Sequence, residues 1–236
     1  MGRIFEKRKH KMFARYDKMA KAFTKIGREI AIAVKSGGPD PEYNPRLRAA
    51  IQNGKGLNMP KDRIDNAIKR ASSKEEGNFE ETVYEGYGPH GVAIVVETAT
   101  DNPTRTVANI RMYFNRGNGT LGKTGSLDFM FQRKGVFRVP ADAPVNIDDL
   151  ELELIDFGLE SMDKEEEETI IYTAYEDYGR MAKALDDKNI PVKKAALERI
   201  PTTFVELSDE QQDEVLQLID KFEEDDDVQA VFHNLK

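Results

Sequence analysis

The sequence predicts an α+β protein with an N-terminal three-helix domain followed by two ferredoxin-like α/β domains, one inserted in the other. Apolar residues recur at helical spacing over residues 17–72, which indicates a small helical bundle. From residue 92 onward, β-branched runs alternate with helical stretches. Residues 136–200 complete a strand–helix–strand–strand–helix–strand unit, and a strand–helix–strand half lies on either side of it. A length of 236 residues suits two or three small domains.

The helical region has clear start and stop signals. The glycines and proline of residues 37–39 end a first helix. Asn44 is a favourable N-cap before Pro45, and Pro60 opens a third helix. Residues 1–16 show too little apolar periodicity for this basic arm to fold alone, and residues 73–80 have the composition of a linker.

The α/β region is divided by the same reasoning. We predict domains over residues 1–78, over 79–134 together with 201–236, and over the inserted 135–200, because the outer halves pair around the middle unit. Ser208 and Gln211 have the spacing of a capping box. Strands are expected over residues 92–98, 127–131, 136–139, 169–173, 195–199, 203–206 and 228–232, with helices from residue 101 and over 148–158, 175–187 and 209–222.

Charge is distributed unevenly along the chain. The net charge is 35 − 43 = −8, which by itself argues against a nucleic-acid binder. Residues 1–75, however, hold 19 Lys+Arg and 8 Asp+Glu, a balance of +11, whereas residues 76–236 hold 16 and 35, a balance of −19. Such asymmetry indicates a basic module that binds polyanions, joined to an acidic body.

Several classes of protein are disfavoured. The absence of Cys removes disulfides, thiolate zinc sites and cysteine nucleophiles. No apolar run approaches the roughly 18 residues of a membrane span, and no signal peptide precedes the basic start, so we expect a cytoplasmic protein without a membrane partner. The three histidines are scattered and no hydrolase motif is present. We therefore expect no enzyme, metal, cofactor or small-molecule substrate, and we interpret the acidic runs at 165–168 and 225–227 as solvated faces.

One motif has the sequence of a phosphate-binding loop but not its predicted structural context. Residues 117–124 match the Walker A string letter for letter. A phosphate-binding loop needs a strand before it and a helix after it, because the amides at the N-terminus of that helix hold the phosphates. Here a helix precedes the loop and a strand-like stretch follows. We interpret the loop as a flexible, glycine-rich turn in which Lys123 is at most a phosphate contact.

The basic segment carries the functional hypothesis. Four cations spaced by three or four residues line one helix face, and six more precede them in the arm, interleaved with Phe5, Phe13 and Tyr16. Cations that neutralise phosphates release counterions, and the aromatic rings can stack on unpaired bases. The alternative interpretation is a solvated basic face, or an arm that docks on the acidic body. The predicted nucleic-acid-binding residues are Arg3, Lys7, Arg8, Lys9, Lys11, Arg15, Lys18, Lys21, Lys25 and Arg28, with Lys61, Arg63 and Lys69 as helpers.

Short motifs along most of the chain resemble the YebC/PmpR family. They include Gly37-Gly38-Pro39-Asp40-Pro41 with Asn44-Pro45-Arg46-Leu47-Arg48, Asn58-Met59-Pro60-Lys61-Asp62, Tyr84-Glu85-Gly86-Tyr87-Gly88-Pro89, Thr100-Asp101-Asn102 and Asp225-Asp226-Asp227-Val228-Gln229. The resemblance covers the chain from about residue 20 to the end. The first 16 residues differ, because typical members open with a His-Ser-Lys-Trp segment and this chain contains no Trp.

The resemblance implies a three-domain layout and a role in regulation. Members of this family are described as probable transcriptional regulators that bind DNA in the cytoplasm. A mitochondrial branch activates translation of a cytochrome oxidase subunit, and some bacterial members are linked to ribosomes. The expected function is therefore DNA-binding transcription regulation, with a translation factor that binds RNA or the ribosome as the alternative.

Overall fold

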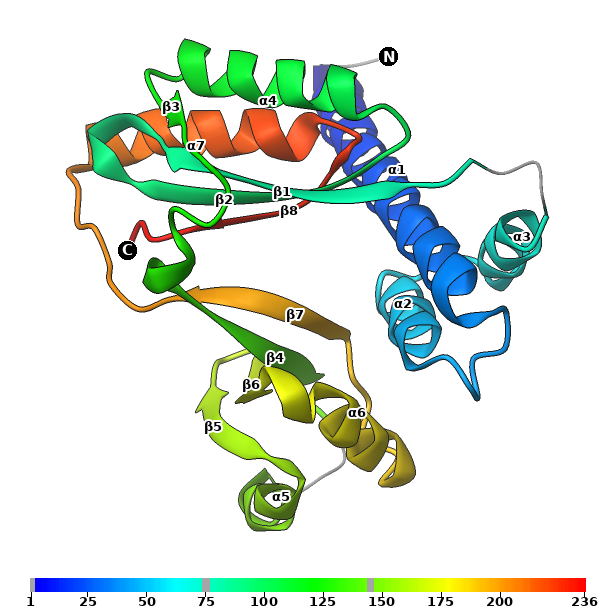
Figure 1. Ribbon diagram of the computed structural model, residues 1–236. Coiled ribbons are helices and arrows are strands. Elements are labelled where there is room, and N and C mark those ends of the chain that lie inside the picture. Colours follow the sequence, from blue (N-terminus) through cyan, green and yellow to red (C-terminus); the bar gives the residue numbers. More distant parts are fainter. Residues whose placement is uncertain (1–2, 74–76, 144–146) are drawn as a thin grey trace. The chain divides into compact units, whose positions relative to one another are not determined.

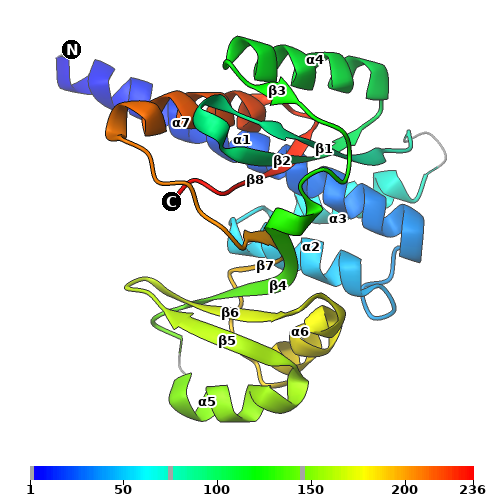
Figure 2. The same ribbon diagram turned by 60° about the vertical axis from the view of Figure 1, so that its left-hand side comes forward.

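The protein consists of two compact units, Met1–Glu76 and Gly77–Lys236. The computed structural model describes residues 3–73, 77–143 and 147–236, and it describes side chains throughout these ranges except at 3–17 and 147–149. The first unit contains three helices, and the second contains two four-stranded sheets with their own helices (Figures 1 and 2). The predicted α+β class is confirmed, while the residue boundaries of the three domains stay a prediction. Among the described residues, no helix is both long enough and apolar enough to span a membrane.

The first unit is built from α1 (Arg3–Gly37), α2 (Pro45–Gly56) and α3 (Lys61–Ala71). Its core contains Ile30 and Leu47, both fully buried, with Ile64. Residues 1–16 were predicted not to fold alone, and in the structure their backbone forms the start of the longer helix α1, which begins at Arg3. Lys, Arg, Met and Ala have high helix propensity, and extending an existing helix avoids the cost of a new nucleus.

Asn44 fixes the connection between α1 and α2. Its side-chain oxygen accepts the Leu47 amide at 3.0 Å, as an N-cap does. Its Nδ2 donates to the carbonyl oxygens of Ala33 at 2.7 Å and Gly38 at 2.8 Å. Asn44 is only 3% exposed, and this one side chain satisfies three backbone groups, of which the Leu47 amide and the Ala33 carbonyl are bonded in a buried environment.

The first sheet of the second unit combines strands from both ends of that unit. Its order is β3 (Thr120–Leu121), β1 (Glu80–Tyr87), β2 (Ala93–Thr100) and β8 (Val228–His233), with every neighbouring pair antiparallel. Helices α4 (Pro103–Arg116) and α7 (Asp209–Glu224) pack on one face (Figure 1). The rings of Phe114 and Phe222, 4.8 Å apart, join the two helices in a common core.

Three sequence expectations fail in this sheet. β1 was missed, because its three Glu and one Gly interrupt the alternation of apolar residues expected in a strand. Residues 127–131 do not form a strand: Asp128–Met130 is a 3₁₀ turn, and its apolar neighbours pack against the face opposite α4 and α7. Residues 203–206 form only an isolated bridge from Val205 to Leu235. The predicted capping box of α7, Ser208 with Gln211, is confirmed.

The second sheet has the ferredoxin-like pattern that the sequence predicts. Its strands are β4 (Phe131–Pro140), β5 (Leu159–Lys164), β6 (Glu168–Ala174) and β7 (Lys194–Pro201), in the spatial order β5-β6-β4-β7. Helices α5 (Ile147–Leu154) and α6 (Tyr178–Asp187) contribute Leu154 and Leu185 to its core. The chain enters this sheet at Phe131 and leaves at Pro201, and these two residues are paired. The whole sheet is therefore an insertion between β3 and α7.

We expect Asn44→Ala to destabilise the junction of α1 and α2 by about 2–3 kcal/mol, because it removes a cap and the amide group that donates to the carbonyl oxygens of Ala33 and Gly38. Hydrogen exchange of the full chain measures this as faster exchange in peptides covering residues 30–50. Asn66→Ala, at an exposed position of α3, is the matched control. Equal exchange in the two variants would show that Asn44 does not hold the junction.

Candidate nucleic-acid interface

Four of the predicted site residues lie on the solvent side of α1. Lys18 is exposed, and Lys21, Lys25 and Arg28 are half-buried. The opposite side of the helix carries the buried Ile26 and Ile30. Lys25 and Arg28 also make contacts within the chain, so part of their bonding capacity is already used. Lys18 and Lys21 extend this charged face towards the N-terminus.

The three cations of α3 that were predicted as site residues are exposed but do not share one face. Lys61 and Arg63 lie about 200° apart around the helix axis, because each residue advances the helix by about 100°. The Arg63 guanidinium lies 5.6 Å from the centre of the Phe23 ring of α1, a cation–π contact. Arg63 therefore helps to attach α3 to α1, while Lys69 points away from the core.

The six predicted arm residues cannot be placed in the same way. The backbone of this segment is helical, so positions 3, 7 and 11 continue the spacing of three or four residues that relates positions 18 to 28. The residues whose side chains lie outside the described part of the chain are Arg3, Lys7, Arg8, Lys9, Lys11 and Arg15.

The basic character of the first unit does not depend on the arm. Residues 18–73 alone hold 12 Lys+Arg and 5 Asp+Glu, a balance of +7. Such a surface attracts polyanions, and the attraction weakens as salt screens it. Charge concentration is what the first unit offers to a polyanionic ligand.

The Walker-like loop is held from inside by a carboxylate. It follows α4 directly, contains the two-residue strand β3 and leads into a 3₁₀ turn, so the next element along the chain is not an α-helix. Glu85, 2% exposed on β1, accepts the amides of Gly125 at 2.9 Å and Leu127 at 2.7 Å. The amide of Gly122 donates to the Glu85 carbonyl oxygen at 2.7 Å. These three amides are occupied by the protein's own groups, while the interpretation of residues 117–124 as a flexible turn stays a prediction.

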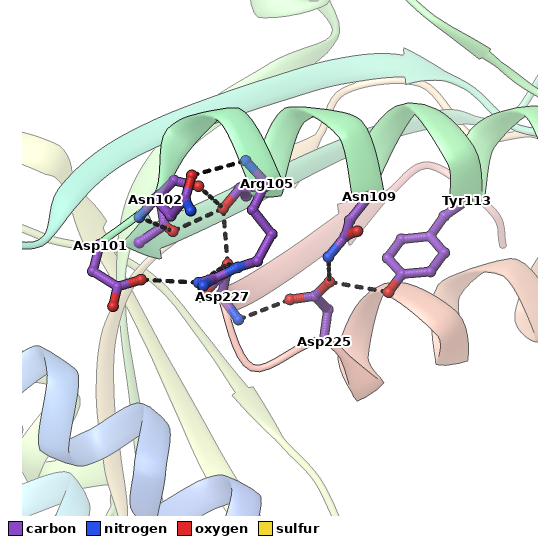
Figure 3. Close-up of polar contacts among 9 residues, drawn as sticks. Asp101, Asn102, Arg105, Asn109, Tyr113, Asp225 and Asp227 are labelled. Atoms are coloured by element: carbon purple, nitrogen blue, oxygen red, sulfur yellow. Dashed lines mark hydrogen bonds and ion pairs between the residues drawn. The ribbon is translucent and has the colours of Figure 1, made fainter.

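The acidic run 225–227 is also used internally (Figure 3). Asp227, 2% exposed, accepts from the Arg105 guanidinium at 2.8 Å and from the Thr106 hydroxyl at 2.8 Å. Asp225 accepts from Asn109 at 3.1 Å and Tyr113 at 3.0 Å. Interpreting this run as a solvated face was wrong, because Asp225 and Asp227 bind the chain's last turn to α4.

The surroundings of Tyr113 change its acidity. Burial, the hydrogen bond to the Asp225 carboxylate and the negative charge of that carboxylate raise the pKa of Tyr113 to about 12. The hydroxyl therefore remains a donor over the whole physiological range. Tyr113 also meets the Phe222 ring edge to face at 5.8 Å, which links the polar cluster to the core.

Family models match nearly the whole chain. The model of the TACO1/YebC N-terminal domain matches residues 3–74, and that of the TACO1/YebC second and third domain matches residues 79–235. The chain belongs to the TACO1/YebC family. The resemblance recognised from the sequence motifs is confirmed, and the match includes most of the arm that those motifs did not cover.

Two similar proteins share one descriptive name, and a solved structure shares the fold of this chain. A protein of Cytophaga hutchinsonii is 57% identical over 235 residues, covering 100% of this chain and 98% of that protein. A protein of Anaeromyxobacter dehalogenans is 53% identical over 240 residues, and the match covers 100% of this chain and 100% of that protein. Both are named probable transcriptional regulatory proteins. The crystal structure of a conserved hypothetical protein from Aquifex aeolicus superposes with a TM-score of 0.82 at 40% identity, covering 92% of this chain and 90% of that one.

We expect Glu85→Gln to destabilise the second unit by about 2–4 kcal/mol, since the new NH₂ group faces an amide that also donates. Urea unfolding of the full chain measures the loss, and hydrogen exchange should locate it in residues 117–131. Glu80→Gln, at the exposed start of the same strand, is the control. A Glu85→Gln variant as stable as this control would mean that the loop does not need the carboxylate.

The raised pKa of Tyr113 predicts a loss of stability in alkali. Between pH 10 and about 12 the unfolded chain releases the Tyr113 proton and the folded chain keeps it, so stability falls as the pH rises. Urea midpoints measured from pH 9 to 11 should fall less steeply for Tyr113→Phe than for the wild type. Tyr43→Phe, which changes a tyrosine that is 81% exposed, should follow the wild type. Identical slopes for all three proteins would contradict this assignment.

Proposed function

We propose that this TACO1/YebC protein is a DNA-binding transcriptional regulator of the cytoplasm that binds the phosphate backbone through its first, helical unit. The observation that supports the proposal is the segregation of charge: residues 1–75 carry +11 and residues 76–236 carry −19. The names of its relatives support a regulatory rather than an enzymatic role.

The contact is electrostatic and independent of sequence. Each lysine or arginine that neutralises a phosphate releases condensed counterions, which gives affinity that falls with salt. Phosphate contacts position a protein on its target but do not read bases. The acidic second unit repels a polyanion, so it orients the helical unit towards the nucleic acid.

The same cations also suit RNA. The alternative is therefore a translation factor that contacts RNA or the ribosome, favoured by the three aromatic residues interleaved with the arm's cations, since such rings stack on unpaired bases. Retention on duplex DNA in gel shifts, compared with co-sedimentation with ribosomes, separates the two targets. The proposed activity is binding in either case, without catalysis.

Charge reversal of Lys18, Lys21, Lys25 and Arg28 to Glu should weaken binding to duplex DNA. If the four cations contact phosphates of the duplex, the slope of log affinity against log salt should become shallower by about 3.6, or about 0.9 for each contact. Deletion of residues 1–16 should also lower the slope while the described core of the first unit, which begins after the arm, stays folded. Fluorescence anisotropy with labelled duplexes at several salt concentrations measures both effects.

The control variant replaces four exposed lysines of the second unit by Glu and so changes the net charge by the same amount as the α1 variant. These are Lys183, Lys188, Lys193 and Lys221. The control variant should leave the salt slope close to that of the wild type, because these lysines lie outside the proposed surface. Unchanged affinity and slope in both the α1 variant and the deletion would move the contact surface out of the helical unit.

A further inference from the structure

The acidic second unit contains one basic stretch. Residues 77–236 hold 16 Lys+Arg and 34 Asp+Glu, but residues 102–141 hold 7 of these cations and only 1 of the acids. The remainder of the unit therefore holds 16 − 7 = 9 cations and 34 − 1 = 33 acids. The basic stretch covers α4, β3, the loop after it and β4.

Some of these cations are neutralised and others are not. Arg105, Lys134 and Arg138 each lie within 2.9 Å of a carboxylate oxygen. Within the described part of the chain no ion pair involves Arg116 or Lys123, and both side chains are exposed. In the sequence these two cations flank β3, the edge strand of the first sheet. Arg116 ends α4, which packs on the face opposite the 3₁₀ turn, whereas Lys123 begins the segment that leads to that turn.

Two exposed aromatic rings lie beside the same edge. Tyr87, 42% exposed, pairs with Thr120 of β3, and its hydroxyl lies 3.9 Å from the sulfur of Met130. Phe129, next to Met130 in the 3₁₀ turn, is 77% exposed, although a phenyl ring is usually buried. Figure 1 shows β3 at the end of the sheet, directly after α4.

The segment that carries Phe129 is held in place from beneath. Residues 122–129 are all exposed except Leu127, which is fully buried. The Glu85 carboxylate binds two amides of this segment, and both the amide and the hydroxyl of Thr202 donate to the Met130 carbonyl oxygen. An exposed ring on a fixed segment binds a ligand without the entropic cost of ordering the loop.

We propose that three side chains, Tyr87, Lys123 and Phe129, form a second nucleic-acid contact, the β3-edge patch, which binds an unpaired nucleotide. The proposal rests on the proposed function and specifies its ligand: a target with a single-stranded stretch. The rings stack on the base faces, and Lys123 contacts an adjoining phosphate. The nearest acid in sequence, Asp128, is directed to Arg199 at 3.6 Å, so the basic stretch is complementary to a polyanion in an otherwise acidic unit.

The test uses the absence of Trp from the chain. Phe129→Trp introduces a single tryptophan, whose fluorescence is quenched when a base stacks on it. A 20-nucleotide oligothymidine should lower the emission by half or more, and a 20-base-pair duplex should change it little. Phe129→Ala should weaken binding of the oligothymidine about fivefold or more and leave duplex binding unchanged.

Two controls make the result decisive. Leu152→Trp places the tryptophan at a position on α5 that is 73% exposed, and its emission should not respond to the oligothymidine. Anisotropy of the labelled oligothymidine measures total binding independently of the tryptophan. The patch would be overturned if the oligothymidine binds by anisotropy but the emission of Phe129→Trp does not change. It would also be overturned if the oligothymidine quenches Leu152→Trp as strongly as Phe129→Trp. Either result would leave the proposed function intact. Absence of binding to both the oligothymidine and the duplex would overturn both proposals.

Discussion

The pairing of β8 with β2 is the contact on which the second unit depends. It pairs Val96 with Val231, and the whole inserted sheet lies between these two residues in the sequence. The first sheet is therefore incomplete until the last strand of the second unit has returned to pair with β2. Closing so long a loop costs entropy, although that cost grows only slowly with length. The buried Asp227, bound to Arg105 and Thr106 of α4, secures the returning strand where it enters the sheet.

Buried carboxylates serve the fold, and exposed charges remain for ligands. Glu85 and Asp227 are each 2% exposed, and both accept several hydrogen bonds from groups distant in sequence. A buried anion is tolerated only when donors replace the water it has lost. The high acid content of the second unit is therefore partly structural. The segment directly after the Walker-like loop likewise donates two amides, those of Gly125 and Leu127, to the internal Glu85 carboxylate.

Much of the fold was predictable, and the errors share a cause. The three helices, the Ser208 cap and the inserted ferredoxin-like sheet follow from local periodicity and capping chemistry, which act within a few residues. β1 was missed because its identity as a strand comes from its neighbours β2 and β3 rather than from its own alternation. The turn at 128–130 was mistaken for a strand because apolar residues that cover a sheet have the same composition as residues within one.

The sequence by itself determined the family, the class of fold and the separation of basic from acidic segments, because motifs, periodicity and charge are properties of the linear chain. Only the tertiary structure decided which charges are available to a ligand. Asp227 became a structural anchor and Arg63 a partner of Phe23, whereas Lys123 stayed exposed beside Phe129. Availability depends on burial and on partners distant in sequence, and both arise only when the chain is folded.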